Sequence, residues 1–122
     1  MALYWEKHIP AMNRLWSSMK IIRDAQALQS VANKINQHKA VYQKVEKETG
    51  VPWQMVAVIH LREAGPNDIG RFKGVLHNGE LIVGTGRRTR LVPAGRGPFS
   101  TWHQAAVHAL KEKNFHKFTK WT

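Results

Sequence analysis

The segment from Val51 to Gly65 constrains the fold more than any other part of the chain, because both of its ends carry helix-boundary signals. Pro52 suits a first helical turn, where its missing N–H would have no partner in any case. The segment then runs apolar from Met55 to Ile59, which is more apolar than a half-exposed helix requires. Gly65-Pro66 is a strong stop signal. These features predict a largely apolar helix that ends beside Gly65.

Glu63 lies in the last turn of this predicted helix. The C-terminal end of a helix carries partial negative charge and apolar surroundings disfavour an ion, so both effects would raise the pKa of Glu63. A glutamate that stays protonated near neutral pH can serve as a general acid. The charge pattern taken alone favours the alternative, a solvated Glu63 paired with Arg62 or a lysine.

Length and composition predict one domain that spans residues 1–122 and needs no disulfide. A chain of 122 residues is long enough to bury a core, and without cysteine it offers no thiolate chemistry. It has no run of about 20 apolar residues, so we expect no transmembrane helix. Residues 1–10 include Glu6 and lack an apolar signal core, so we expect no secretory signal.

Net charge is the strongest global feature of the chain. It has 19 lysines and arginines against 8 acidic residues, a formal charge of +11. Such a surface favours a polyanionic partner, which is either nucleic acid or anionic cell-envelope material. The basic residues are spread from Lys7 to Lys120. This spread is more typical of a generally attractive surface than of an element that reads a sequence.

Apolar spacing predicts helices in the N-terminal part, residues 1–49. An amphipathic helix is expected after Pro10, within residues 1–19. Residues 20–49 carry an apolar stripe at three- and four-residue steps, which predicts one long helix that ends at Gly50. We expect both helices to pack within the domain.

The C-terminal part is also predicted to be helical. Ser100 is expected to cap a helix whose inner face carries Trp102, Ala105, Ala106, Ala109 and Leu110. In the tail, residues 112–122, aromatic residues recur at three-residue steps from Phe115 to Trp121. This spacing predicts one more short helix that docks by its aromatic side chains.

Residues 72–93 differ from the rest because they are short apolar runs interrupted by glycines. Asn78-Gly79 is a strong hairpin-turn dipeptide, so we predict a small β-hairpin or irregular β-lobe here. Gly84-Thr85-Gly86 lacks the strand and helix that flank a phosphate-binding loop. No cofactor is therefore expected.

Four blocks of this sequence, in order, resemble one family. Residues 51–64, VPWQMVAVIHLREA, are similar to the "VPxxxxAxIHxRES" helix of lysozyme-like peptidoglycan hydrolases from phages and bacteria. Residues 76–81, LHNGEL, resemble the family's "LHNGDPL", and residues 92–99, VPAGRGPF, resemble its "VPAGRP…PF". Residues 102–110 resemble its "TWEESAxDAL". The likeness covers roughly residues 50–111, with Ala64 where the family often has Ser and Glu80 where Asp is usual.

The resemblance implies a lysozyme-like fold of the α+β class, mostly α, in which helices surround a small β-hairpin lobe with the active-site cleft between them. Residues 1–49 would be N-terminal helices, residues 50–111 the catalytic helix, lobe and following helix, and residues 112–122 a short C-terminal helix. The family usually continues with a further helix and an aromatic, Gly-rich motif. The resemblance therefore implies that a closing helix is supplied differently, or that this chain belongs to a longer or split enzyme.

By resemblance, Glu63 is the catalytic acid of a muramidase that cleaves the bond between N-acetylmuramic acid and N-acetylglucosamine. The sugar cation that develops needs a carboxylate, a water or the substrate's acetamido group on its other face. Glu80 is the first candidate for a second carboxylate and Asp68 the next. A single-Glu enzyme, which includes a lytic transglycosylase that makes an anhydro sugar, is the alternative. Candidate substrate-binding residues are His60, His77, Asn78, Thr85, Arg90 and Arg96.

The histidines do not predict a metal site. His60 and Glu63 lie three residues apart, but a zinc-protease helix has the pattern H-E-x-x-H and this one reads H-L-R-E. His77, His103 and His108 show no ligand spacing. His60 is instead expected to pack or hydrogen-bond beside the site.

The expected partner is therefore bacterial peptidoglycan with its anionic envelope polymers, bound by a monomer without a metal. For a phage endolysin, the resemblance implies that the enzyme moves from the host cytoplasm to the cell wall through a holin, or travels with the virion. The rival class is a non-enzymatic basic protein that binds nucleic acid or envelope polymer. That class explains the charge of +11 equally well, but it does not explain an acid at the end of an apolar helix.

Overall fold

The computed structural model describes residues 9–11, 13–14, 17–18, 25–118 and 121. These residues fall into two compact units, residues 1–30 and residues 31–122. In the first unit the described residues between 9 and 18 are helical, as predicted after Pro10, and Ser17 Oγ donates to the Asn13 carbonyl at 2.9 Å. The other apolar residues of that prediction, Tyr4, Trp5, Met12, Leu15, Trp16 and Met19, lie outside the described residues, as do residues 20–24.

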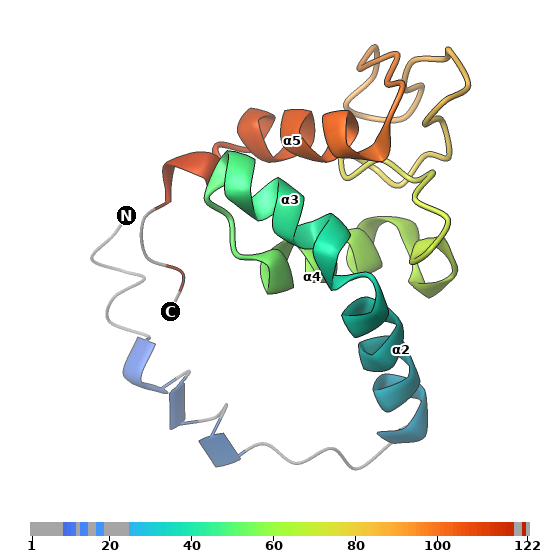
Figure 1. Cartoon of the computed structure of the whole chain (residues 1–122). Coiled ribbons are helices and arrows are strands. Elements are labelled where there is room, and N and C mark those ends of the chain that lie inside the picture. The colour runs from blue at the N-terminus through green and yellow to red at the C-terminus, as the bar shows by residue number, and fades with distance from the viewer. Residues whose placement is uncertain (1–8, 12, 15–16, 19–24, 119–120, 122) are drawn as a thin grey trace. The chain divides into compact units, whose positions relative to one another are not determined.

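The second unit is mostly helical, as predicted (Figure 1). α2 (Ala25–Gln37) begins in the first unit and ends in the second. The elements after it are α3 (Lys39–Thr49), α4 (Trp53–Ala64), the 3₁₀ turn η1 (Pro66–Asp68), α5 (Trp102–Glu112) and the 3₁₀ turn η2 (Phe115–Lys117). In the described part of the chain, no helix has the length and apolar character needed to cross a membrane.

The single long helix predicted for residues 20–49 is wrong, because the chain breaks at His38. The backbone of His38 leaves the helical region at φ −108° and ψ 17°, and its N–H is shared between the carbonyls of Lys34 and Ile35 at 3.3 and 3.1 Å. The His38 ring packs edge-on against Phe72 with centroids 5.3 Å apart. The apolar stripe continues through the break, so its periodicity does not reveal it. α2 has no buried residue, whereas α3 buries Tyr42 and Val45 completely.

The core lies between α3, α4 and α5, and α3 packs on both of the others. α5 presents the predicted inner face, since Trp102, Ala105, Ala106, Ala109 and Leu110 are all buried. The Trp102 indole N–H also donates to the Gly74 carbonyl at 3.0 Å, which ties α5 to the segment after η1. The predicted cap is off by one residue. The side chain of Thr101 accepts from the Gln104 N–H at 3.2 Å, whereas the Ser100 N–H donates to the Gln104 side chain.

The prediction of a small β-hairpin or irregular β-lobe over about residues 72–93 is wrong, because residues 25–118 contain no strand and only one isolated bridge, between Gly74 and Leu81. The Asn78-Gly79 turn itself is present. The Gly79 N–H donates to the Val75 carbonyl at 2.8 Å, and Gly79 adopts φ +83°. Beyond the bridge no ladder continues, and side chains satisfy part of the backbone alongside isolated backbone hydrogen bonds. Glu80 accepts from the N–H groups of Arg90 and Leu91 at 2.8 and 2.5 Å.

The predicted C-terminal helix is reduced to the single turn η2, followed by an aromatic cluster. The rings of Phe115, Phe118 and Trp121 contact one another with centroids 5.3 to 6.0 Å apart. Phe115 and Trp121 pack against the core, whereas Phe118 is 53% exposed. The aromatic steps therefore mark a docked tail, as predicted, and the described residues after Lys113 form only the turn η2.

Candidate functional site

The turn at residues 78–80 packs directly on the C-terminal end of α4. A Cβ atom built on Gly79 would lie 1.9 Å from the Glu63 carbonyl oxygen, so only glycine allows this approach. Gly74 likewise faces the Ala64 side chain, where an added Cβ would lie 2.5 Å from that of Ala64. These two contacts place Glu63 and the segment that carries Glu80 beside each other.

The Glu63 carboxyl group is within reach of solvent. Its side chain is 25% exposed, and the Lys113 ammonium, just beyond the end of α5, lies 3.9 Å from Oε1. α4 therefore ends with a carboxyl group that a ligand can contact, near a flexible cation. Such a group can donate or accept a proton, or bind a cation.

Glu80 has a structural task in the same region. Its Oε1 atom accepts both backbone bonds from residues 90 and 91, and its own N–H is capped by Asn78 Oδ1 at 3.0 Å. Asn78 also donates from Nδ2 to the Leu91 carbonyl at 3.2 Å. Glu80 and Asn78 together clamp the loop of residues 88–91 to the turn.

Asp68 and His60, two of the predicted site residues, belong to a buried hydrogen-bonded chain. His60 is fully buried, and its Nε2 atom lies 2.7 Å from Asp68 Oδ2. Its Nδ1 atom lies 2.8 Å from the Tyr42 hydroxyl. Asp68 also accepts from the backbone N–H groups of Lys73 and Gly74 at 3.1 and 2.8 Å.

Burial sets the protonation of this chain. It lowers the pKa of His60, against the opposing hydrogen bond and charge of Asp68. Burial, and then the charge of Asp68, raise the pKa of Tyr42. The consistent arrangement is that Tyr42 donates to His60 and His60 donates to Asp68. Both ring nitrogens of His60 are thus occupied, and a substrate contact predicted for His60 finds no support in this geometry.

An open groove of about 500 Å³ begins at Ala64, the residue after Glu63. A volume of this order suits a small ligand or a short polymer segment. The groove is lined by Ala64, Asn67, Asp68, Arg71, Lys73, Leu81, Val83, Gly84 and Thr85. Glu63 and Glu80 are not among the lining residues, so the groove adjoins the two glutamates and does not contain them. Arg71 and Lys73 give it a basic wall.

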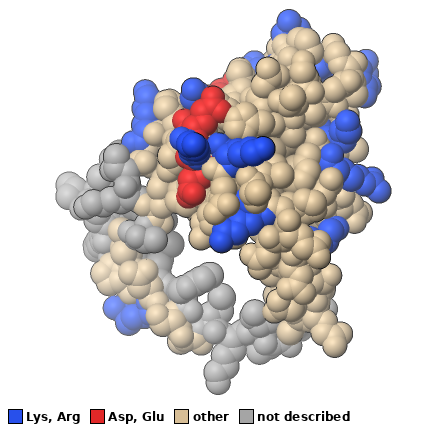
Figure 2. All heavy atoms as spheres, viewed as in Figure 1, with Lys and Arg blue, Asp and Glu red and all other residues tan. Residues whose placement is uncertain are grey.

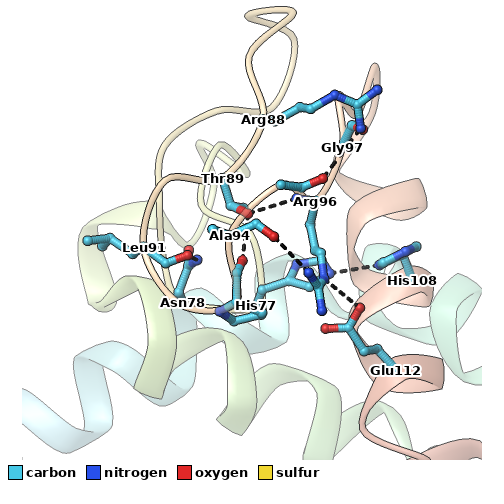
Figure 3. A network of polar contacts seen from close by, with 12 residues as sticks. His77, Asn78, Arg88, Thr89, Leu91, Ala94, Arg96, Gly97, His108 and Glu112 are labelled. Atoms are coloured by element: carbon cyan, nitrogen blue, oxygen red, sulfur yellow. Dashed lines mark hydrogen bonds and ion pairs between the residues drawn. The ribbon is translucent and has the colours of Figure 1, made fainter.

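Three further predicted residues lie apart from one another. Thr85 lines the groove, although its hydroxyl already donates to the Ile82 carbonyl at 2.6 Å. The Arg90 side chain is exposed beside Leu91. Arg96 lies elsewhere, in a polar network with α5 (Figure 3), where its Nε donates to Glu112 Oε2 at 2.9 Å and its Nη1 to the Ala94 carbonyl at 2.7 Å.

The same network contains a pair of histidines that sequence spacing did not bring together (Figure 3). His77 is 6% exposed, and its Nε2 atom lies 2.8 Å from His108 Nδ1. Burial and the neighbouring His108 lower the pKa of His77 to about 4, so the ring is neutral at physiological pH. Glu112, which was not predicted as a site residue, completes the group. Its pKa is lowered by the hydrogen bond from Arg96.

Basic side chains are distributed over several elements of the face in Figure 2, and acidic ones gather in one small area. This agrees with the spread of lysine and arginine along the sequence. No protein-family model, no curated protein and no solved structure matches this chain.

Proposed function

We propose that this protein is a lysozyme-like peptidoglycan hydrolase in which Glu63 protonates the glycosidic oxygen between N-acetylmuramic acid and N-acetylglucosamine. The observation that carries the proposal is the position of Glu63. A partly exposed carboxyl group ends an apolar helix at the point where the 78–80 turn and an open groove meet. Two of the four sequence blocks that resemble the family, residues 51–64 and 76–81, meet at this point.

The groove supports a polymeric, acidic substrate. Arg71 and Lys73 line it, and muramic acid and its attached peptides carry carboxylates that such cations attract. The clamp made by Glu80 and Asn78 holds the loop of residues 88–91 beside the turn. In this proposal the clamp fixes one wall of the binding region.

The second catalytic group is assigned to a water or to the substrate's own acetamido group. The Oε1 atom of Glu80 accepts hydrogen bonds from two backbone N–H groups. Asp68 is 3% exposed and is hydrogen-bonded to His60. Both carboxylates therefore have structural roles. A lone Glu63 is sufficient for either outcome, hydrolysis or formation of an anhydro sugar by lytic transglycosylation. Mass spectrometry of the released fragments distinguishes them, since only hydrolysis adds a water.

A non-enzymatic basic binding protein is the second candidate. The charge of +11 and its distribution support this class. It predicts retention on anionic polymer, without any cleavage of glycan and without any dependence on Glu63.

For the hydrolase proposal, the resemblance to phage enzymes implies that the enzyme would reach the cell wall through a holin or with the virion.

The decisive test replaces Glu63 with Gln and measures lysis of permeabilised Gram-negative cells by turbidity. The amide keeps the shape of the side chain and cannot donate the proton, so the rate should fall by about 10²–10⁴-fold, the usual contribution of a general acid. Circular dichroism should stay unchanged.

Glu48→Gln is the matched control for this test. Glu48 is a half-exposed glutamate that pairs with His103 at 2.5 Å, and its replacement should leave lysis intact. Near-wild-type lysis by Glu63→Gln would contradict the assignment of Glu63 as the general acid. Equal loss in both variants would instead point to a general effect of the substitutions and not to a catalytic role of Glu63.

A further inference from the structure

Three side chains of types that can bind a metal ion meet beside α5, in the network of Figure 3. His108 and Glu112 lie four residues apart on α5 and so share one face of that helix. His77 reaches them from the turn before Asn78. One ligand atom from each residue can be chosen so that all three lie within 4.8 Å of one another.

We propose that His77, His108 and Glu112 form a binding site for a divalent transition metal, with Zn²⁺ the ion that the donors suit best. Two imidazoles and one carboxylate are typical of zinc sites that keep an open position. The same donors would accept Co²⁺ or Fe²⁺, whereas Ca²⁺ and Mg²⁺ prefer oxygen ligands. This site is separate from the glycan chemistry proposed for Glu63.

The spacing of the two histidines is close to that of a metal-bound pair. Zn–N bonds of about 2.0–2.1 Å at a tetrahedral angle place two ligand nitrogens about 3.3 Å apart. The His77 Nε2 and His108 Nδ1 atoms are 2.8 Å apart. A small opening of this pair would therefore admit the ion, and His108 and Glu112 are exposed enough to leave a position open to water.

Packing orients both rings before any ion arrives. The His77 ring stacks on Phe99 with centroids 5.4 Å apart, and the His108 ring contacts the same Phe99 at 5.3 Å. Burial of His77 keeps its ring neutral, as a ligand must be. The buried Nδ1 atom of His77 has no hydrogen-bond partner among the described residues. Metal at Nε2 would place the ring proton on Nδ1.

Two cations near the site set limits on its affinity. Arg96 donates to Glu112 Oε2, which orients the carboxylate as outer partners of metal ligands do. Arg96 and Lys113 are both close enough to lower the pKa of His77, so they also repel a bound cation. The site is therefore expected to bind a transition metal with stoichiometry one, and more weakly than a structural zinc site.

The test is isothermal titration of the full-length chain, free of any histidine tag, with ZnCl₂ and separately with CoCl₂. The wild type should bind one ion. His108→Ala and Glu112→Gln should each weaken binding at least tenfold, because each removes one of three ligands. His103→Ala, which removes a histidine of the same helix that pairs with Glu48, should bind as the wild type does.

A second readout is the melting temperature, which a ligand of the native state raises. Zn²⁺ should raise the Tm of the wild type and of His103→Ala, EDTA should reverse the rise, and His108→Ala should lose it. Absence of one-to-one binding in the wild type, or wild-type affinity in His108→Ala and Glu112→Gln, would overturn the proposal. Neither result depends on glycan cleavage, so failure here is distinct from failure of the function proposed for Glu63.

Discussion

At the scale of single residues, the most consequential feature is the buried chain of Tyr42, His60 and Asp68. A buried polar group is costly unless it is hydrogen-bonded, and here every link is made within 2.8 Å. Asp68 also binds the backbone of Lys73 and Gly74. The chain therefore connects α3, α4 and the segment after η1, and it fixes the end of α4 where Glu63 lies.

Tyr42→Phe tests this chain with the loss of a single hydroxyl group. The variant leaves His60 Nδ1 buried without a donor, so the free energy of unfolding should fall by about 1–3 kcal/mol. Urea denaturation of the wild type and the variant measures the change. Asp68→Asn is the second arm, and because both residues bond the same ring, the double variant should lose less than the sum of the two. Strictly additive losses, or a loss near zero for Tyr42→Phe, would contradict a coupled chain.

Single residues differ in how far the sequence could predict them. The position of Glu63 follows from local signals, since Pro52 and Gly65 set the ends of α4. The burial of His60 and Asp68 does not, because it depends on Phe72 and Trp102, whose rings surround His60 only in the folded chain. His77 lies 31 residues before His108, so that cluster is a tertiary contact. Its only sequence signal is the four-residue step from His108 to Glu112.

At the scale of elements, the site depends on how closely the 78–80 turn approaches α4. Gly79→Ala would place a methyl group within 1.9 Å of the Glu63 carbonyl oxygen, and backbone atoms there cannot move aside. We expect a loss of at least about 3 kcal/mol in the free energy of unfolding, which combines the clash with the strain of a positive φ. If the variant still folds, the turn must move away from α4, and lysis should drop with it.

Gly86→Ala is the control for Gly79→Ala. Gly86 has a similar φ of +75°, but nothing lies within 4 Å of an added Cβ. The free energy of unfolding of this variant should fall only by the strain of the positive φ, about 1–2 kcal/mol, and the variant should keep its activity. Equal destabilisation of the two variants would show that the close approach of the 78–80 turn to α4 does not account for the destabilisation by Gly79→Ala.

The elements themselves were predicted unevenly, for a physical reason. α4 and α5 were found because their boundaries and inner faces are local signals. The prediction of a hairpin was wrong because turn residues reverse the direction of the chain but do not ensure a ladder of hydrogen bonds between two strands. After the bridge of Gly74 and Leu81, the carboxylate of Glu80 takes the bonds that a strand partner would have made. The break at His38 was missed because the apolar stripe continues through it.

At the scale of the whole molecule, the dominant property is a net charge of +11 that no single element carries. Charge spread in this way raises the rate of encounter with a polyanion and does not define a chemical step. The bacterial envelope is such a polyanion. Under the proposed function, we therefore expect the surface charge to act on encounter with the envelope and Glu63 to act in the chemical step.

Salt separates these two stages. The screening length is about 8 Å at physiological ionic strength and about 3 Å at 1 M, so long-range attraction fades over that range. Lysis of intact cell walls should slow steeply as NaCl rises, because encounter is lost. Cleavage of short, neutralised glycan fragments should change little, because proton transfer from Glu63 takes place within the bound complex. The two rates are measured side by side, by turbidity and by chromatography of the fragments. If both substrates lose activity in parallel, the charge acts within the chemical step or on the fold itself, and this division between encounter and catalysis does not hold.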